Sequence, residues 1–427
     1  MPPTIIARSE ATFTIQLEIP YASSMFDFEE LIQQRLNEAG VLATTEALHQ
    51  FDADGSPITI GDTKLTSKGK LVKEYQTPYG VAPVERHVYQ SSRGGKTYCP
   101  LDREARVVIS STPKFAKMVS HKYAEFGSAR VIKDLAENHG RRVARCFVQD
   151  VTDAVATVAL ARQEDWEYAL PELEQTPPTI TIGMDGTCLL MCEGGWRETM
   201  VGTIGFYDAE GDRQHTIYLA ATPEYGKATF LDRMGREVER VKGLYPRAHY
   251  LGIADGATGN WDFLGPRTET QIVDFYHAAA YLSDAADVLF RGKPREKESW
   301  LEDRCHRLKH ESGAAGAILK EIKGLATMNR RANGHEDVEK AITYFGNQNR
   351  KGRMDYATWV EAGQPIGSGV TEAACKVIVK QRLCGSGMKW TEDGAAAVLS
   401  VRCLTYTTER WSQFWSKIDR YGFPVAA

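Results

Sequence analysis

A run of alternating β-branched residues, Thr179-Ile180-Thr181-Ile182-Gly183-Met184, leads directly into Asp185-Gly186. This pattern predicts a buried central strand that ends at an aspartate. A second apolar run, Tyr250-Leu251-Gly252-Ile253-Ala254, leads in the same way into Asp255-Gly256. If the two strand ends meet at one edge of a sheet, their carboxylates come together, and such sites hold divalent metal ions. For either strand taken alone, an ordinary Asp-Gly turn is the structural alternative.

The composition is that of a globular protein with two or three domains. The chain has 427 residues, of which 42% are hydrophobic and 25% are charged. No apolar run approaches the length of a membrane span, and Met1-Pro2-Pro3-Thr4 does not resemble the start of a signal peptide. The eight cysteines are scattered without a CxxC pair, as expected for free thiols in a reducing compartment. We therefore expect a cytoplasmic protein that does not bind membranes.

Two basic stretches stand out in a chain whose net charge is −4. Residues 114–145 contain eight Lys or Arg against three Asp or Glu, and residues 291–353 contain fifteen against nine. Locally basic helices on an otherwise acidic chain are typical of a DNA-binding protein with a carboxylate metal site. Solvated surface helices would have a similar composition.

The N-terminal half is predicted to contain two parts. Residues 1–110 read as a small β-rich α+β module, because short strand signals broken by Gly and Pro run from Ile58 to Tyr98. Seven Lys or Arg lie between Lys64 and Lys96. Residues 111–170 read as a helical region, which a Pro-containing linker separates from the second half.

Within residues 111–170, the pattern is that of a helix-turn-helix. An amphipathic helix over 128–138, capped by Ser128, is followed by a Gly-containing turn and a second helix over 141–160. A plain helical hairpin would show the same pattern. Because the second helix begins with basic residues, we expect three of them to contact DNA: Arg141, Arg142 and Arg145.

The second half has the element order that opens a ribonuclease-H-like fold. Strands are predicted over 196–206, 215–221 and 271–274, in addition to the two that carry the aspartates, and a helix over 227–244. In that fold the first and fourth strands are adjacent, which would bring Asp185 beside Asp255. The catalytic core is expected to comprise residues 178–277 and 356–427, with an α-helical insertion over 278–355.

A third acid follows Gln364-Pro365-Ile366-Gly367-Ser368-Gly369-Val370-Thr371, at Glu372. Ser368 is predicted to cap a helix that places Glu372 in its first turn, with Lys376 and Lys380 on the same face. Simple complementation of the helix dipole is the alternative reading for Glu372. Together with Asp185 and Asp255 it forms a DDE constellation, which predicts a two-metal site for Mg²⁺, with Mn²⁺ expected to substitute.

Five motifs, taken in order, resemble those of ISKra4-type bacterial insertion-sequence transposases over about residues 60–410. They are Met184-Asp185-Gly186, Ile253-Ala254-Asp255-Gly256-Ala257, Asp274-Phe275-Tyr276-His277-Ala278, Gly367-Ser368-Gly369-Val370-Thr371-Glu372 and Gly385-Ser386-Gly387-Met388-Lys389-Trp390. The third is also similar to the (C/D)xxH signature of DDE transposases that carry a helical insertion before the glutamate.

The resemblance implies a transposase that cuts and joins DNA strands at terminal inverted repeats and at target DNA. It further implies a homodimer or larger assembly on double-stranded DNA, in a bacterial cytoplasm at the nucleoid. Asp185, Asp255 and Glu372 would be the catalytic metal ligands. Asp274 and His277 would lie next to these ligands and would not bind the metal ions themselves. Further DNA contacts are expected from Lys320, Lys323, Arg330, Arg331, Lys376, Lys380, Arg382 and Lys389.

Two other functions remain open from the sequence. One is a transposase-derived DNA-binding protein without catalysis, although the three acids would then have no role. The other is a ribonuclease-H-like nuclease or resolvase, which would need neither the basic N-terminal half nor the helical insertion.

Overall fold

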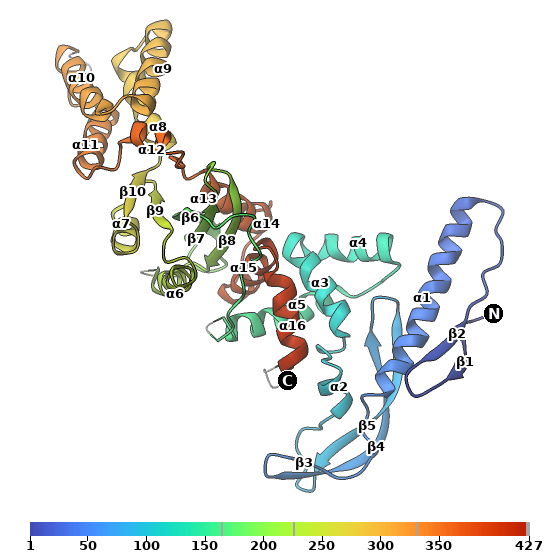
Figure 1. The fold of residues 1–427 in the computed structure, drawn as a ribbon. Helices are drawn as coiled ribbons and strands as arrows, with labels where there is room; N and C mark the ends of the chain where they lie inside the picture. The colour runs from blue at the N-terminus through green and yellow to red at the C-terminus, as the bar shows by residue number, and fades with distance from the viewer. Residues whose placement is uncertain (164, 225–226, 330–331, 424–427) are drawn as a thin grey trace. The chain divides into compact units, whose positions relative to one another are not determined.

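The computed structural model describes residues 1–163, 165–224, 227–329 and 332–423 of the chain. It divides into two compact units, which are described separately (Figure 1). The first comprises residues 1–169 together with 396–405 and 409–423, and the second comprises residues 170–395 with 406–408. Across the described ranges, no helix has the combination of length and apolar character needed to cross a membrane.

The first unit opens with a hairpin and a long helix, followed by a three-stranded antiparallel sheet of order β3-β4-β5. The hairpin strands pair antiparallel, and Ser24 caps the helix by accepting a hydrogen bond from the backbone N–H of Asp27 (3.1 Å). The elements are β1 (Thr4–Arg8), β2 (Phe13–Gln16), α1 (Met25–His49), β3 (Ile58–Ile60), β4 (Thr63–Gln76) and β5 (Val81–Ser91).

Helices complete the first unit, and two of them, α15 and α16, come from the far end of the sequence. Trp411, Phe414 and Trp415 of the C-terminal helix pack on one another, and Trp166 packs edge-on against Phe414. Arg402 is buried and donates a hydrogen bond to the carbonyl of Ala124. The helices are α2 (Pro100–Glu104), α3 (Pro113–Glu125), α4 (Ser128–His139), α5 (Arg145–Ala161), α15 (Glu392–Tyr406, of which 396–405 lie in this unit) and α16 (Arg410–Tyr421).

This arrangement corrects one predicted boundary. The sequence assigned all of residues 356–427 to the catalytic core, whereas residues 396–405 and 409–423 belong to the first unit. The reason is the apolar face of α16, whose buried aromatic side chains complete the core formed by the N-terminal helices. The division at residue 169 falls at the end of the predicted helical region 111–170.

The second unit is built on a five-stranded mixed sheet of order β10-β9-β6-β7-β8. Strands β6, β7 and β8 form an antiparallel meander. Strand β9 runs parallel to β6, and β10 runs parallel to β9. The predicted pairing of the first strand with the fourth is confirmed. The strands are β6 (Thr179–Leu190), β7 (Trp196–Tyr207), β8 (Arg213–Ala221), β9 (His249–Ala254) and β10 (Thr270–Val273).

Helices pack on both faces of this sheet. On one face, Gly202 lies so close to Met234 and Phe230 of α6 that a side chain there would clash. On the other face, Gly183 lies equally close to Thr371 of α13. The helices are α6 (Ala228–Leu244), α7 (Thr258–Leu264) with a 3-10 turn (Gly265–Arg267), α8 (Phe275–Leu289), α9 (Pro294–His310), α10 (Ala314–Met328), α11 (Glu336–Arg350), α12 (Tyr356–Glu361), α13 (Gly369–Ala374), a π-helical segment (Cys375–Lys380) and α14 (Gln381–Leu383).

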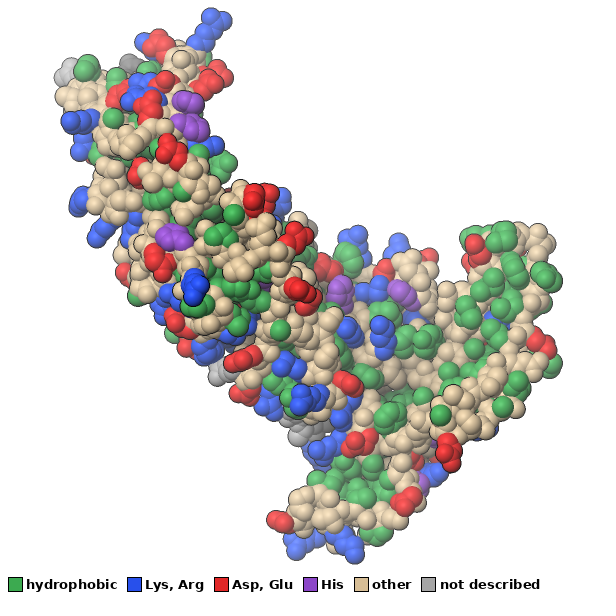
Figure 2. Space-filling model, viewed as in Figure 1, with side chains coloured by type: hydrophobic (Ala, Val, Ile, Leu, Met, Phe, Trp, Pro, Cys, Tyr) green, Lys and Arg blue, Asp and Glu red, His purple; other side chains and the backbone are tan. Residues whose placement is uncertain are grey.

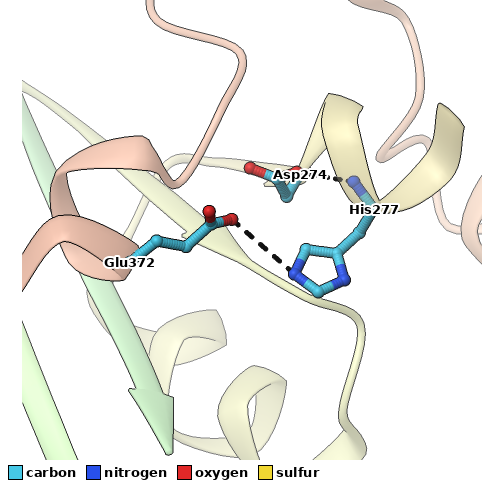
Figure 3. A group of neighbouring side chains, drawn as sticks. All are labelled: Asp274, His277 and Glu372. Atoms are coloured by element: carbon cyan, nitrogen blue, oxygen red, sulfur yellow. Dashed lines mark hydrogen bonds and ion pairs between the residues drawn. The ribbon is translucent and has the colours of Figure 1, made fainter. Parts of the chain in front are cut away.

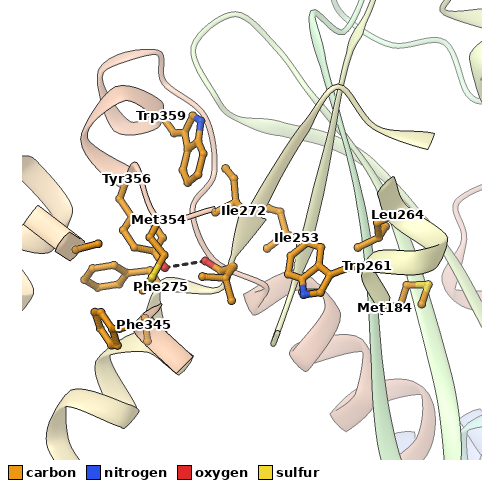
Figure 4. Close-up of a cluster of buried hydrophobic side chains, with 14 of the residues drawn as sticks. Met184, Ile253, Trp261, Leu264, Ile272, Phe275, Phe345, Met354, Tyr356 and Trp359 are labelled. Carbon is orange, nitrogen blue, oxygen red and sulfur yellow. Dashed lines mark hydrogen bonds between the residues drawn. The ribbon is translucent and has the colours of Figure 1, made fainter. Parts of the chain in front are cut away.

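Helices also occupy the stretch between Asp255 and Glu372, where the insertion was predicted. Their core is continuous with that of the sheet, as Figure 4 shows for Phe275, Phe345 and Tyr356. The hydroxyl of Tyr356 donates a hydrogen bond to the carbonyl of Val273 in β10 (2.9 Å). The helical stretch is therefore anchored directly to the edge of the sheet.

We predict that Phe414→Ala lowers the free energy of unfolding by about 3–5 kcal/mol, because it leaves a cavity among buried aromatic rings. Urea denaturation followed by tryptophan fluorescence measures the change. The matched control is Ser412→Ala, an exposed position on the same helix, which should change stability by less than about 0.5 kcal/mol. Equal stabilities of the two variants would contradict the assignment of α16 to a packed core.

Candidate functional site

Asp185 lies within β6, not at its end as the sequence suggested. β6 continues to Leu190 because β7 pairs with it over its whole length. The parallel neighbour β9, in contrast, pairs with β6 only as far as Gly183 opposite Ile253. The ladder ends there, and continuing its register by two residues would put Asp185 opposite Asp255, at the same edge of the sheet, even though only Asp255 follows a strand end.

The carboxylate of Asp185 points toward the helix that carries Glu372. Its Oδ2 accepts a hydrogen bond from the thiol of Cys375 (3.6 Å), and its Oδ1 accepts one from the backbone N–H of Gly186 (2.7 Å). Burial, and then the nearby Asp185 carboxylate, raise the pKa of the Cys375 thiol. Cys375 therefore stays protonated and acts as a neutral donor to Asp185.

Asp255 is held by its own loop and by the helical insertion. Its Oδ1 accepts hydrogen bonds from the backbone N–H of Ala257 (3.0 Å) and from Nδ2 of Asn260 (3.1 Å). The hydroxyl of Tyr344 on α11 donates to its backbone carbonyl (2.8 Å). Burial raises the pKa of Tyr344, which keeps this donor protonated. The helical insertion thus fixes the backbone at the second aspartate.

Glu372 occupies the first turn of α13, as predicted, and its side chain is exposed. Ser368 stands at the N-cap position, but its hydroxyl donates to Oε1 of Glu372 (3.0 Å) and does not cap a backbone N–H. One residue earlier, the hydroxyls of Thr371 and Thr203 of β7 are hydrogen-bonded at 2.7 Å. The start of this helix is therefore fixed to the sheet directly beneath the glutamate.

Asp274 joins two segments of the site. It is fully buried, and it caps α8 by accepting a hydrogen bond from the backbone N–H of His277 (2.7 Å). Its other oxygen accepts a hydrogen bond from the backbone N–H of Ser368. As Figure 3 shows, the imidazole of His277 then faces Glu372, with Nε2 3.7 Å from Oε1. Both oxygens of Asp274 accept hydrogen bonds from backbone amides. The role of Asp274 is therefore to hold His277 and Ser368 in position.

The site residues surround a surface pocket of about 660 Å³. Five of the predicted residues line it, namely Asp185, His277, Glu372, Lys376 and Lys380. The carboxylate of Asp255 does not appear in its lining. Much of the wall is the π-helical segment, and π-helical turns are rare and frequently found at functional sites.

The donor atoms fit a divalent cation that prefers oxygen ligands. Asp185 and Glu372 present carboxylates to the pocket, which suits Mg²⁺. One ligand atom from each of Asp274, His277 and Glu372 also lies within 4.8 Å of the others, but both oxygens of Asp274 already accept backbone hydrogen bonds. Two of the three predicted metal ligands, Asp185 and Glu372, therefore share this pocket, and Asp255 does not line it.

The predicted DNA contacts in the helical region need one correction. Arg141 is buried and donates hydrogen bonds to the carbonyl of Thr77 (2.9 Å) and to Oε1 of Gln76 (2.7 Å), so it serves the fold and is not available to phosphates. The second helix begins at Arg145, four residues later than predicted. Arg142 and Arg145 remain exposed, and Nε of Arg145 donates to Ser128 (2.8 Å).

Beyond the helix that carries Glu372, Arg382 also needs a correction. It is buried with its guanidinium over the ring of Trp390, so it braces the end of the helix and does not face solvent. Lys389 is exposed, as are Lys320 and Lys323 on α10. The two remaining predicted contacts, Arg330 and Arg331, lie outside the described residues.

Sequence reasoning missed several residues of the site. Cys375 lies three residues after Glu372, a helical spacing that could have marked it as a neighbour. Ser368 precedes Glu372 by four residues and was identified only as a cap. Tyr344 and Thr203 carry no local signal, because each reaches the site from a distant element.

Comparisons with known proteins add no assignment. No protein-family model matches the chain, and no curated protein is significantly similar to it.

We predict that Asp274→Asn destabilises the protein by about 1–3 kcal/mol. An asparagine has one oxygen acceptor where two buried amides need one each, so one amide is left unsatisfied. Urea denaturation measures the effect, and hydrogen exchange of the Ser368 and His277 amides should become faster. The control is Asp262→Asn, an exposed position on α7. Equal stability of the two variants would contradict the claim that both oxygens of Asp274 accept buried backbone hydrogen bonds.

Proposed function

We propose that this chain is a DDE transposase of the ISKra4 type, which cleaves and joins DNA strands at the inverted-repeat ends of an insertion sequence. One observation carries the proposal. Asp185 and Glu372 line one pocket, and the β6–β9 register brings Asp255 to the same edge of the sheet. Acids on a strand, after a strand end and on a helix support a two-metal phosphoryl-transfer site, in which all three carboxylates would share the bound ions.

The sheet topology supports a ribonuclease-H-like core. Three antiparallel strands in sequence order are followed by a helix, and then by two parallel strands added on the far side of the first. In that fold the catalytic acids sit on the first strand, after the fourth strand and on a late helix. Asp185, Asp255 and Glu372 occupy those three places.

The chain's own residues supply orientation and charge. Divalent ions bound between the carboxylates would activate the attacking oxygen and stabilise the leaving oxygen of the phosphodiester. His277 faces Glu372 and restricts its position, and Cys375 donates to Asp185. Lys376 and Lys380 line the same pocket, where their ammonium groups would contact the phosphates of the DNA strand.

The helical insertion has a role in this proposal. Its inner helix α11 hydrogen-bonds the backbone of Asp255 and Gly256, so it is rigidly tied to the catalytic edge. Its α10 exposes Lys320 and Lys323. We propose that these lysines hold DNA that flanks the scissile phosphate, because deformed DNA presents more backbone to a basic surface.

A second candidate is a transposase-derived DNA-binding protein without catalysis. One observation favours it, namely that the carboxylate of Asp255 already accepts hydrogen bonds from Ala257 and Asn260. Both bonds go to Oδ1, so a catalytic role would place the metal ion on Oδ2.

We predict that Asp185→Asn, Asp255→Asn and Glu372→Gln each reduce strand cleavage and joining by more than about 100-fold, beyond the usual effect of residues that only support a metal ligand. The substrate is a duplex carrying the inverted repeat found beside the gene, with Mg²⁺ or Mn²⁺ present. Binding to this duplex should persist, because each substitution removes negative charge near DNA.

Glu361→Gln, an exposed change on α12, is the matched control and should retain wild-type activity. Cleavage without joining would favour the nuclease. Binding without either reaction, in the wild-type protein, would favour the non-catalytic descendant.

A further inference from the structure

A basic surface lies on the β-rich module of the first unit, on strands and not on the helices that the sequence singled out. We call it the basic ribbon and define it by five residues on β4 and on the loop that follows β5: Lys64, Lys68, Lys70, Arg93 and Lys96. All five side chains are exposed. Figure 2 shows Lys and Arg side chains gathered at the tip of this sheet.

The backbone of the ribbon projects these cations outward. β4 and β5 pair over most of their length, but the register shifts between Ser67 and Lys70, which leaves a β-bulge. Gly69 within the bulge has a φ of +95°, and a Cβ there would meet no atom within 4 Å. The surface at Gly69 is therefore open, and the exposed Lys68 and Lys70 flank Gly69 in the sequence.

The loop after β5 is held in place beside the bulged strand. The hydroxyl of Ser91 donates to the carbonyl of Gly94 (2.8 Å), and Nε2 of Gln90 donates to the carbonyl of Gly95 (2.7 Å). Gln90 and Ser91 are the direct partners of Thr66 and Leu65 across the ladder. The cations of the loop and those of β4 thus belong to one ordered surface.

Three of the ribbon's lysines, all on β4, are not neutralised by nearby acids. Lys73, further along β4, forms an ion pair with Asp102 (3.0 Å). Within the described ranges, Lys64, Lys68 and Lys70 have no acidic partner within ion-pair distance. In contrast, Arg141 of the expected helix-turn-helix is buried in the fold. Three exposed lysines without acidic partners on one strand are what a polyanion binds.

We propose that the basic ribbon binds the phosphate backbone of double-stranded DNA, with the bulged hairpin lying along a groove. A two-stranded antiparallel ribbon fits the major groove of B-DNA, and lysines beside it reach the phosphates on the groove walls. The inference rests on the proposed function, and it moves the main DNA contact of the first unit from the helices to the sheet. The contact is expected to be largely independent of sequence.

The test measures binding of the full-length protein to a fluorescein-labelled 30-bp duplex of arbitrary sequence, by fluorescence anisotropy without divalent metal. In Lys64→Ala/Lys68→Ala/Lys70→Ala, Kd at about 0.1 M NaCl should rise at least about tenfold. The slope of log Kd against log salt should fall by about 2–3, because each lost phosphate contact releases one counterion fewer.

The charge-matched control is Arg236→Ala/Lys293→Ala/Lys340→Ala, which removes three exposed cations that already pair with acids. Its Kd and salt slope should stay within about twofold of the wild type. Equal weakening in both triple variants would assign the effect to net charge and overturn the proposal. The proposal would also be overturned if the ribbon variant bound the DNA duplex as tightly as the wild type does. Tighter binding of a matched RNA duplex than of the DNA duplex by the wild type would likewise overturn it.

Folding of the ribbon variant is checked by circular dichroism. If it is perturbed, Lys68→Gln/Lys70→Gln, confined to the bulge, replaces it and should still raise Kd and lower the salt slope. Because no metal is present, this test can fail while the cleavage assay succeeds, and the reverse also holds.

Discussion

The candidate site depends on two hydrogen bonds that the buried carboxylate of Asp274 accepts. It accepts a hydrogen bond from the backbone N–H of His277 at the start of α8. It accepts another from the backbone N–H of Ser368 at the start of α13, and Ser368 follows Asp274 by 94 residues. The helical insertion lies between these two points. Whatever the insertion does, its two ends are therefore tied to one charged group next to the sheet. This group fixes His277 against Glu372 and sets the position from which the catalytic helix departs.

Close packing adds the second constraint. Gly183 leaves room for Thr371, whose hydroxyl is bonded to Thr203 on the neighbouring strand, so α13 rests directly on β6 and β7. Two residues along the same face of β6 lies Asp185, and one residue along the helix lies Glu372. The backbone positions that carry these two acids are therefore fixed by close packing of α13 on β6 and β7. Preorganised ligands of this kind bind cations without a large entropic cost.

The sequence predicted much of this fold because its signals are local. Strands β7, β8 and β10 and helix α6 lie within two residues of their predicted bounds, as their hydrophobic periodicity and turns require. Asp185 was expected at a strand end because Gly186 resembles a turn, and only pairing with β7 reveals the continuation. Arg141 and Arg382 were read as surface cations because burial of an arginine depends on distant partners such as Gln76 and Trp390. For the same reason, the return of α16 to the first unit left no local signal.

The most direct test of the account is to locate Mn²⁺ by anomalous scattering in crystals of the protein soaked with the ion. We expect anomalous density within about 2.1 Å of carboxylate oxygens from Asp185, Asp255 and Glu372, with Asp274 still bonded to its two amides. Density bound by Asp274, His277 and Glu372 alone would contradict it, as would the absence of any ion at this edge of the sheet.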